Sequence, residues 1–121
     1  MTIEPTYDER GLVPVIVQDV NTRAVLMLAY ANEASLEATI ATGRMTFWSR
    51  SRETLWEKGE TSGNTMSVVD MRLDCDSDAV LVRVEPAGPA CHTGSTTCFD
   101  GGAAVEGDRD GVDVLASLWA T

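Results

Sequence analysis

The segment from Asp74 to Asp78 places three carboxylates and a thiol, Cys75, within five consecutive residues, directly before an apolar stretch. Repulsion among three carboxylates calls for a compensating cation. On an extended chain successive side chains alternate, so the aspartates would point one way and Cys75 the other. Carboxylates suit Mg²⁺ or Ca²⁺, whereas a thiolate suits zinc. The segment therefore predicts a magnesium-type site on Asp74, Asp76 and Asp78, and a separate zinc ligand at Cys75.

Two other interpretations of the aspartates remain open. Their spacing matches positions 1, 3 and 5 of an EF-hand loop, and Glu85 falls at position 12. However, Ala79 occupies the position where that loop needs glycine, and a strand-like segment with Pro86 follows instead of a helix. The aspartates can also form a solvated turn ahead of a strand, without any metal.

The sequence contains three cysteines, Cys75, Cys91 and Cys98, and one histidine, His92. An odd number of cysteines argues against a disulfide framework and favours thiol chemistry or metal ligation. Three thiolates leave one coordination position open, as in catalytic zinc sites, where the bound water is acidified. His92 adjoins Cys91 and is poorly placed to bind the same ion, so we predict that it acts as a general acid or base. A structural histidine and a cysteine–histidine nucleophilic pair are the alternatives.

The segment FWSRSRETLWEKGETSGN is a candidate substrate-binding region. In an extended conformation Trp48, Arg50 and Arg52 share one face, where two arginines can clamp a phosphate beside an aromatic ring that stacks on a base. The glycine-containing loop that follows can donate backbone N–H groups to phosphate oxygens. An exposed strand whose tryptophan covers the core is the alternative. The predicted substrate-binding residues are Trp48, Arg50, Arg52, Lys58, Ser62 and Asn64.

These candidate residues are positioned by a chain that is mostly β. Apolar, β-branched runs predict strands at residues 12–20, 24–30, 68–73 and 79–84, and residues 44–52 are also of β type. Asn32 as N-cap and Gly43 as a stop predict one helix between them, with Leu36 and Ile40 on one face. We therefore expect a single β-rich α+β domain over residues 1–121, with one principal helix. Residues 101–121 form an acidic tail, with a short amphipathic helix expected near residues 112–119.

Composition restricts the partners. The net charge is −10, from nineteen acidic and nine basic residues, which disfavours nucleic-acid binding. The longest apolar run, AVLMLAYA, is far shorter than the roughly 20 residues of a membrane span, so no membrane association is expected. The first residues do not resemble a signal peptide, and we expect a cytoplasmic protein.

Three motifs together, WSRSRETLWEKGETSGNT, LDCDSD and GPACHTGSTTCF, resemble the phosphoribosyl-AMP cyclohydrolases of histidine biosynthesis. The resemblance runs from about Leu12 to Phe99. Three positions differ from the usual pattern of that family: Ala31 replaces methionine, Met66 replaces glutamine, and Thr97 replaces serine. The cysteines and aspartates of the motifs are all retained.

The resemblance implies a hydrolase that opens the purine ring of 1-(5-phosphoribosyl)-AMP between N1 and C6. It also implies Zn²⁺, Mg²⁺ and an intertwined homodimer with shared zinc sites, in which one subunit contributes the residue matching Cys75 and the other those matching Cys91 and Cys98. Magnesium on the three aspartates would let an acidic protein bind an anionic nucleotide. A zinc-stabilised interaction module without catalysis is the alternative, and it would need a fourth protein ligand and no nucleotide.

Overall fold

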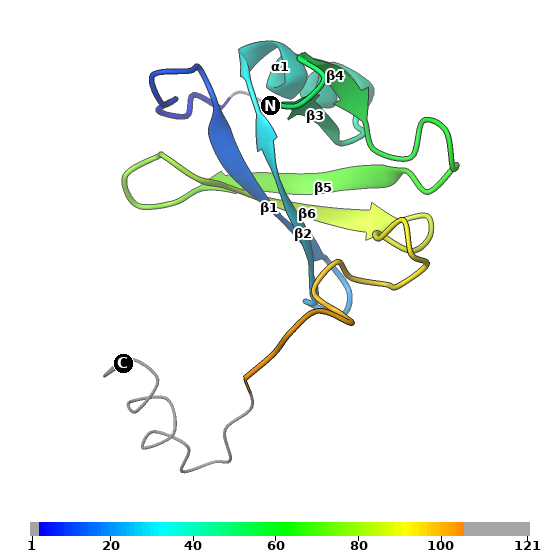
Figure 1. Ribbon diagram of the computed structural model, residues 1–121. Coiled ribbons are helices and arrows are strands. Elements are labelled where there is room, and N and C mark those ends of the chain that lie inside the picture. The colour runs from blue at the N-terminus through cyan, green and yellow to red at the C-terminus, as the bar shows by residue number, and fades with distance from the viewer. Residues whose placement is uncertain (1–2, 106–121) are drawn as a thin grey trace, which may run out of the picture.

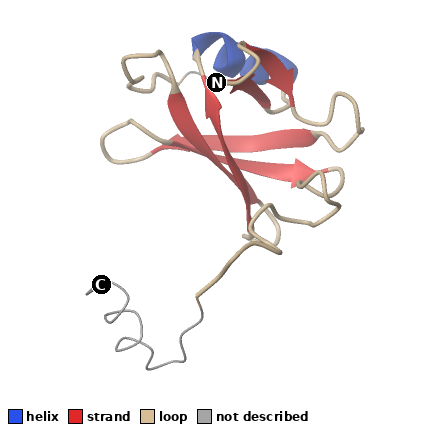
Figure 2. Ribbon diagram, in the orientation of Figure 1, coloured by secondary structure: helices blue, strands red, loops and turns tan. Residues whose placement is uncertain are grey.

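The structure, a computed structural model, describes residues 3–105 (Figure 1). The expected helix near residues 112–119 lies outside this range. The described chain contains one α-helix and six strands, and Figure 2 shows that strand dominates. The predicted fold class, a β-rich α+β domain with one principal helix, is confirmed. In chain order the elements are β1 (Val13–Asp19), β2 (Val25–Ala31), α1 (Glu33–Thr42), β3 (Thr46–Ser49), β4 (Thr54–Glu57), β5 (Met66–Leu73) and β6 (Val80–Pro86).

Four of the strands form one sheet in the order β2-β1-β6-β5. β1 pairs with β2 in antiparallel and with β6 in parallel orientation, and β6 pairs with β5 in antiparallel orientation. β3 and β4 form a separate two-stranded hairpin. β6 lies inside the sheet, between β1 and β5. The turn before β6 and the loop after it emerge at opposite ends of this strand (Figure 1).

Local hydrogen bonds set both ends of α1. The Asn32 side chain accepts a hydrogen bond from the Ser35 N–H at 2.9 Å, and the Ser35 hydroxyl accepts one from the Asn32 N–H at 2.8 Å. This reciprocal pair satisfies two N–H groups that have no partner within the helix. At the other end Gly43 has a φ of 75°, a left-handed conformation that favours glycine. The predicted helix boundaries are therefore confirmed.

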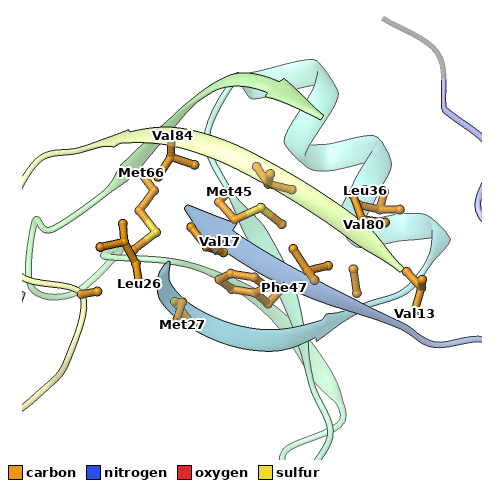
Figure 3. Close-up of a cluster of buried hydrophobic side chains, with 14 residues drawn as sticks. Val13, Val17, Leu26, Met27, Leu36, Met45, Phe47, Met66, Val80 and Val84 are labelled. Carbon is orange, nitrogen blue, oxygen red and sulfur yellow. The ribbon is translucent and has the colours of Figure 1, made fainter. Parts of the chain in front are cut away.

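The hydrophobic core lies between the sheet and the layer formed by α1 and β3. Alternate residues of β1 and β6 point into it, as period-two side-chain geometry requires. Figure 3 shows these valines around Phe47 and Met45. Phe47 and Met45 are fully buried, so the start of the hairpin is fixed to the sheet.

The opposite face of the sheet carries apolar side chains that α1 and the hairpin do not cover. Ile16 of β1 aligns with Leu28 of β2 and with Leu81 of β6, so the three side chains lie side by side. Leu28 is 48% exposed, and Ile16 and Leu81 are half-buried. No helix within residues 3–105 is long and apolar enough to cross a membrane.

Candidate functional site

Residues 74–79 form a tight turn between β5 and β6, so the prediction of an extended chain here was wrong. The Asp74 carboxylate accepts hydrogen bonds from the backbone N–H groups of Asp78 at 3.0 Å and Ala79 at 3.1 Å. Ser77 has a φ of 65°, which reverses the chain. Nevertheless one carboxylate oxygen from each of Asp74, Asp76 and Asp78 lies within 4.8 Å of the others. The turn thus gathers the three predicted magnesium ligands, all exposed, without strand alternation.

The three carboxylates perturb one another's ionisation. A hydrogen bond with Asp78 holds the pKa of Asp76 below its usual value. Hydrogen bonds with Asp76 and Asp74 raise the pKa of Asp78 to about 6. Deprotonation of Asp78 adds a negative charge beside Asp76, which strengthens the attraction for a divalent cation. The donor set therefore fits Mg²⁺, a hard cation that prefers oxygen ligands.

Cys91 and Cys98 are brought together by the loop that follows β6. The loop closes on itself through a hydrogen bond from the Cys91 N–H to the Ser95 carbonyl at 3.1 Å. It is attached to β2 by a hydrogen bond from the Cys98 N–H to the Leu26 carbonyl at 2.7 Å. The Thr93 hydroxyl donates to Cys91 Sγ at 3.1 Å, which lowers the pKa of the Cys91 thiol, whereas burial raises the pKa of Cys98. The pair fits a metal that binds thiolates, and Cys91 ionises more readily.

Cys75 does not join this pair within one chain. It lies in the turn before β6, whereas Cys91 lies beyond the other end of that strand (Figure 1). β6 has seven residues. At about 3.3 Å per residue, the strand alone separates the two ends by roughly 20 Å. Zinc–sulfur bonds of about 2.3 Å cannot bridge such a distance. Within residues 3–105 the three aspartates are the one cluster of three or more metal-binding side chains, so a single chain offers two of the three thiolates at one point.

A pocket of about 330 Å³ lies between this loop and the loop that connects β4 to β5. His92 and Cys91 line it on one side. Lys58, which donates a hydrogen bond to the Ala90 carbonyl, ties the two loops together. The predicted residues that this pocket brings together are Lys58, Ser62, Asn64, Cys91 and His92.

A second pocket, of about 600 Å³, contains the other predicted substrate-binding residues, Trp48, Arg50 and Arg52. β3 ends at Ser49, and both arginines lie in the turn that joins it to β4. The prediction that they continue an extended strand was therefore wrong. The turn nevertheless places them beside Trp48, and the Arg50 guanidinium lies 4.0 Å from the centre of the Tyr30 ring.

Trp56 lines both pockets and was missed in the sequence. It lies directly opposite Phe47 in the β3–β4 hairpin. The alternation in TLWE, with two aromatic residues facing each other across a short turn, was the signal that could have identified it. Tyr30, whose ring packs against the Arg50 guanidinium, was missed for a different reason. Its partner Arg50 lies in a segment that is distant in the sequence.

Two of the positions that differ from the family pattern have clear structural roles. Met66 is fully buried beside Leu26 in the core, so its side chain does not reach the pockets (Figure 3). Thr97 donates a hydrogen bond to the Val25 carbonyl at 2.7 Å and thereby holds the loop that carries Cys91 and Cys98 against β2. A serine hydroxyl can make the same bond, so threonine preserves this contact.

The pocket wall formed by the β4–β5 loop depends on a glycine. Gly59 has a φ of 83°, and a Cβ atom there would lie 2.3 Å from the carbonyl carbon of Asn64. We expect Gly59→Ala to destabilise the protein by about 2–5 kcal/mol, combining left-handed strain with the clash. Gly63→Ala is the matched control, because Gly63 has the same φ of 83° but no atom within 4 Å of an added Cβ. The free energy of unfolding of Gly63→Ala should fall by about 1–2 kcal/mol. Urea unfolding measures both free energies. Equal losses in Gly59→Ala and Gly63→Ala would contradict the role of the close contact between position 59 and Asn64.

Comparison with known proteins shows the family that this chain resembles. The family model described as phosphoribosyl-AMP cyclohydrolase matches residues 27–100. The phosphoribosyl-AMP cyclohydrolase of Archaeoglobus fulgidus is 59% identical over 97 residues, which cover 80% of this chain and 90% of that protein. The phosphoribosyl-AMP cyclohydrolase of Sphingopyxis alaskensis is 60% identical over 95 residues, covering 78% of this chain and 75% of the relative.

Some relatives are longer. The histidine biosynthesis bifunctional protein HisIE of Thermus thermophilus is 58% identical over 115 residues, or 95% of this chain. The match covers 53% of that protein, so this chain spans about half the length of the bifunctional relative.

Fold and site together define a small α+β protein whose chemistry-bearing residues lie on turns and loops around one sheet. The chain belongs to the phosphoribosyl-AMP cyclohydrolase family, a family of enzymes.

Proposed function

We propose that this chain catalyses the hydrolytic opening of the purine ring of 1-(5-phosphoribosyl)-AMP. The bond that breaks is N1–C6, the product is the phosphoribosylformimino-AICAR-phosphate, and the reaction is a step of histidine biosynthesis. The observation that carries the proposal is the pocket in which Cys91 and His92 face Lys58. It supports the proposal because a thiol, an imidazole and an ammonium group line one space, and family membership supplies the reaction.

Zinc is the metal that we propose for the thiolates. When bound, it would acidify the water that attacks C6. Residues of this chain would transfer the proton and bind the substrate. His92 is exposed on the pocket wall and is the group available to donate a proton to N1 as the ring opens. Lys58 and the loop that carries Ser62 and Asn64 would hold a ribose phosphate in place.

We further propose that the working unit is a homodimer. The length of β6, roughly 20 Å between the turn that carries Cys75 and the loop that carries Cys91 and Cys98, supports it, because a second chain can supply the missing thiolate. A twofold axis that crosses β6 at right angles would bring the turn before β6 of one chain beside the loop after β6 of its partner. Because the axis is twofold, this contact between turn and loop would form twice, giving two equivalent zinc sites. Of the uncovered apolar residues, Ile16 and Leu81 lie on the two central strands, where such an axis would pass, and Leu28 lies beside them on edge strand β2.

Magnesium is proposed for the turn of three aspartates. We expect Asp76→Asn to weaken activation by Mg²⁺ by about tenfold or more, because one ligand becomes neutral, while zinc content stays unchanged. Cys75 is not part of the carboxylate cluster, which supports two separate metal sites. Activity measured against Mg²⁺ concentration, with zinc determined by metal analysis, tests this expectation. Glu9→Gln, an exposed change of equal charge, is the control. Loss of zinc in Asp76→Asn would instead indicate one merged site.

The direct test is the change in ultraviolet absorbance when phosphoribosyl-AMP is added to the purified protein. We expect turnover that a chelator abolishes and that added Zn²⁺ and Mg²⁺ restore. The alternative, a zinc-stabilised interaction module, predicts metal binding without turnover. It is disfavoured because, within the described residues, no further cysteine or histidine completes a zinc cluster with Cys91 and Cys98.

A further inference from the structure

Trp56 lies where the two pockets meet. It borders the pocket of about 600 Å³ that contains Arg50 and Arg52, and also the pocket of about 330 Å³ that contains Cys91 and His92. A ligand that fills both pockets must therefore pass beside Trp56.

The ring is held in a fixed orientation. Phe47, fully buried, lies behind it with 5.4 Å between ring centroids and a tilt of 40°. Lys58 Nζ lies 5.4 Å from the ring centroid. Trp56 itself is half-buried, so part of its surface remains open to the pockets. A rigid indole with an accessible face is suited to stacking against a planar heterocycle.

Arg50 and Arg52, which line the larger pocket, are available for an anion. Among residues 3–105 the ion pairs of arginine are those of Arg72 and Arg83 with Asp70. Arg50 instead stacks on Tyr30, and Arg52 Nε contacts the hydroxyl of Ser49 at 3.5 Å. Two guanidinium groups that have no acidic partner within residues 3–105, in a chain of net charge −10, are suited to binding a phosphate.

We propose that Trp56 is the platform on which the purine of the nucleotide stacks, and that it sets the orientation of the substrate across the two pockets. The inference rests on the proposed function. The substrate is a purine with a phosphoribosyl arm on N1 and another on N9, at opposite sides of the bicycle. C6, next to N1, must face Cys91 and His92. The N9 arm then points away from the reacting bond, and its phosphate lies at Arg50 and Arg52. Trp56 is thus a specificity-determining residue for the base, and the arginines read the phosphate of the AMP half.

Adenosine 5′-monophosphate and ribose 5-phosphate are the probes, since the first carries base and phosphate and the second lacks the base. We expect Trp56→Leu to weaken AMP binding, measured by calorimetry, by about 5- to 100-fold, the scale of one base–aromatic stack, and to leave ribose 5-phosphate binding within twofold. Trp56→Phe should restore AMP binding to within about threefold. Arg50→Ala should weaken both probes and raise KM for phosphoribosyl-AMP more than it lowers kcat.

A measurement on the unmodified protein covers the case in which Trp56→Leu does not fold. The indole N–H resonance of Trp56, assigned with Trp56→Phe, should shift on addition of AMP and not on addition of ribose 5-phosphate. AMP that binds without moving this resonance, or that does not bind at millimolar concentration, would overturn the proposal. The proposed function is judged separately: turnover with an unmoved Trp56 resonance rejects the stacking platform alone, whereas a shifted resonance without turnover rejects the hydrolase.

Discussion

Cys75→Ser and Cys91→Ser, each inactive alone, are expected to recover about a quarter of the wild-type activity when they are unfolded together and refolded. In the proposed dimer, each variant by itself lacks one ligand in every zinc site. In a mixed dimer with shared sites, both lesions fall in one site and the other site is intact. Half of the dimers are mixed and half of their sites work, which gives the quarter by symmetry. Turnover and zinc content of the refolded mixture are the measurements.

A matched control exists in the same loop. In the proposed dimer Cys91 and Cys98 of one site come from the same chain, so Cys91→Ser mixed with Cys98→Ser leaves a lesion in every site of every mixed dimer. That mixture should therefore stay inactive. If the Cys75 and Cys91 variants also stay inactive together, in samples shown by mass spectrometry to contain mixed dimers, the shared site is rejected. Recovery in both mixtures would reject it as well.

His92→Ala is expected to reduce kcat by about 10²-fold or more while both metals and the fold are retained, the usual effect of removing a general acid or base. The side chain is exposed and makes no side-chain hydrogen bond within the described chain, so its removal should change unfolding little. His92→Gln is the second variant, because glutamine can donate a hydrogen bond but cannot shuttle a proton. It should be as slow as His92→Ala. Single-turnover kinetics measure the effect, and near-normal kcat in His92→Ala would remove His92 from the mechanism.

Local interactions made part of the fold predictable from the sequence. The helix was predictable because Asn32 and Ser35 bond to each other three residues apart and because Gly43 ends it through its own conformation. The fold class followed from the apolar, β-branched runs that became β1, β2, β5 and β6. The proposed metals rest on side-chain chemistry alone, since carboxylates and thiolates differ in the metals they prefer.

Contacts between distant segments decided the rest. Antiparallel pairing of β5 and β6 turned the acidic segment into a tight turn, so Asp74, Asp76 and Asp78 converge although strand alternation does not apply. The same pairing placed Met66 in the core, away from the pockets.

The site itself also depends on tertiary structure. A bond to Leu26, far away in sequence, positions Cys98 beside Cys91, and the length of β6 separates both from Cys75. The hairpin register, which faces Trp56 with Phe47, created the junction of the two pockets. The sequence shows which chemical groups are present. Strand pairing and loop attachment fix the distances between these groups, because both join residues that no local sequence pattern connects.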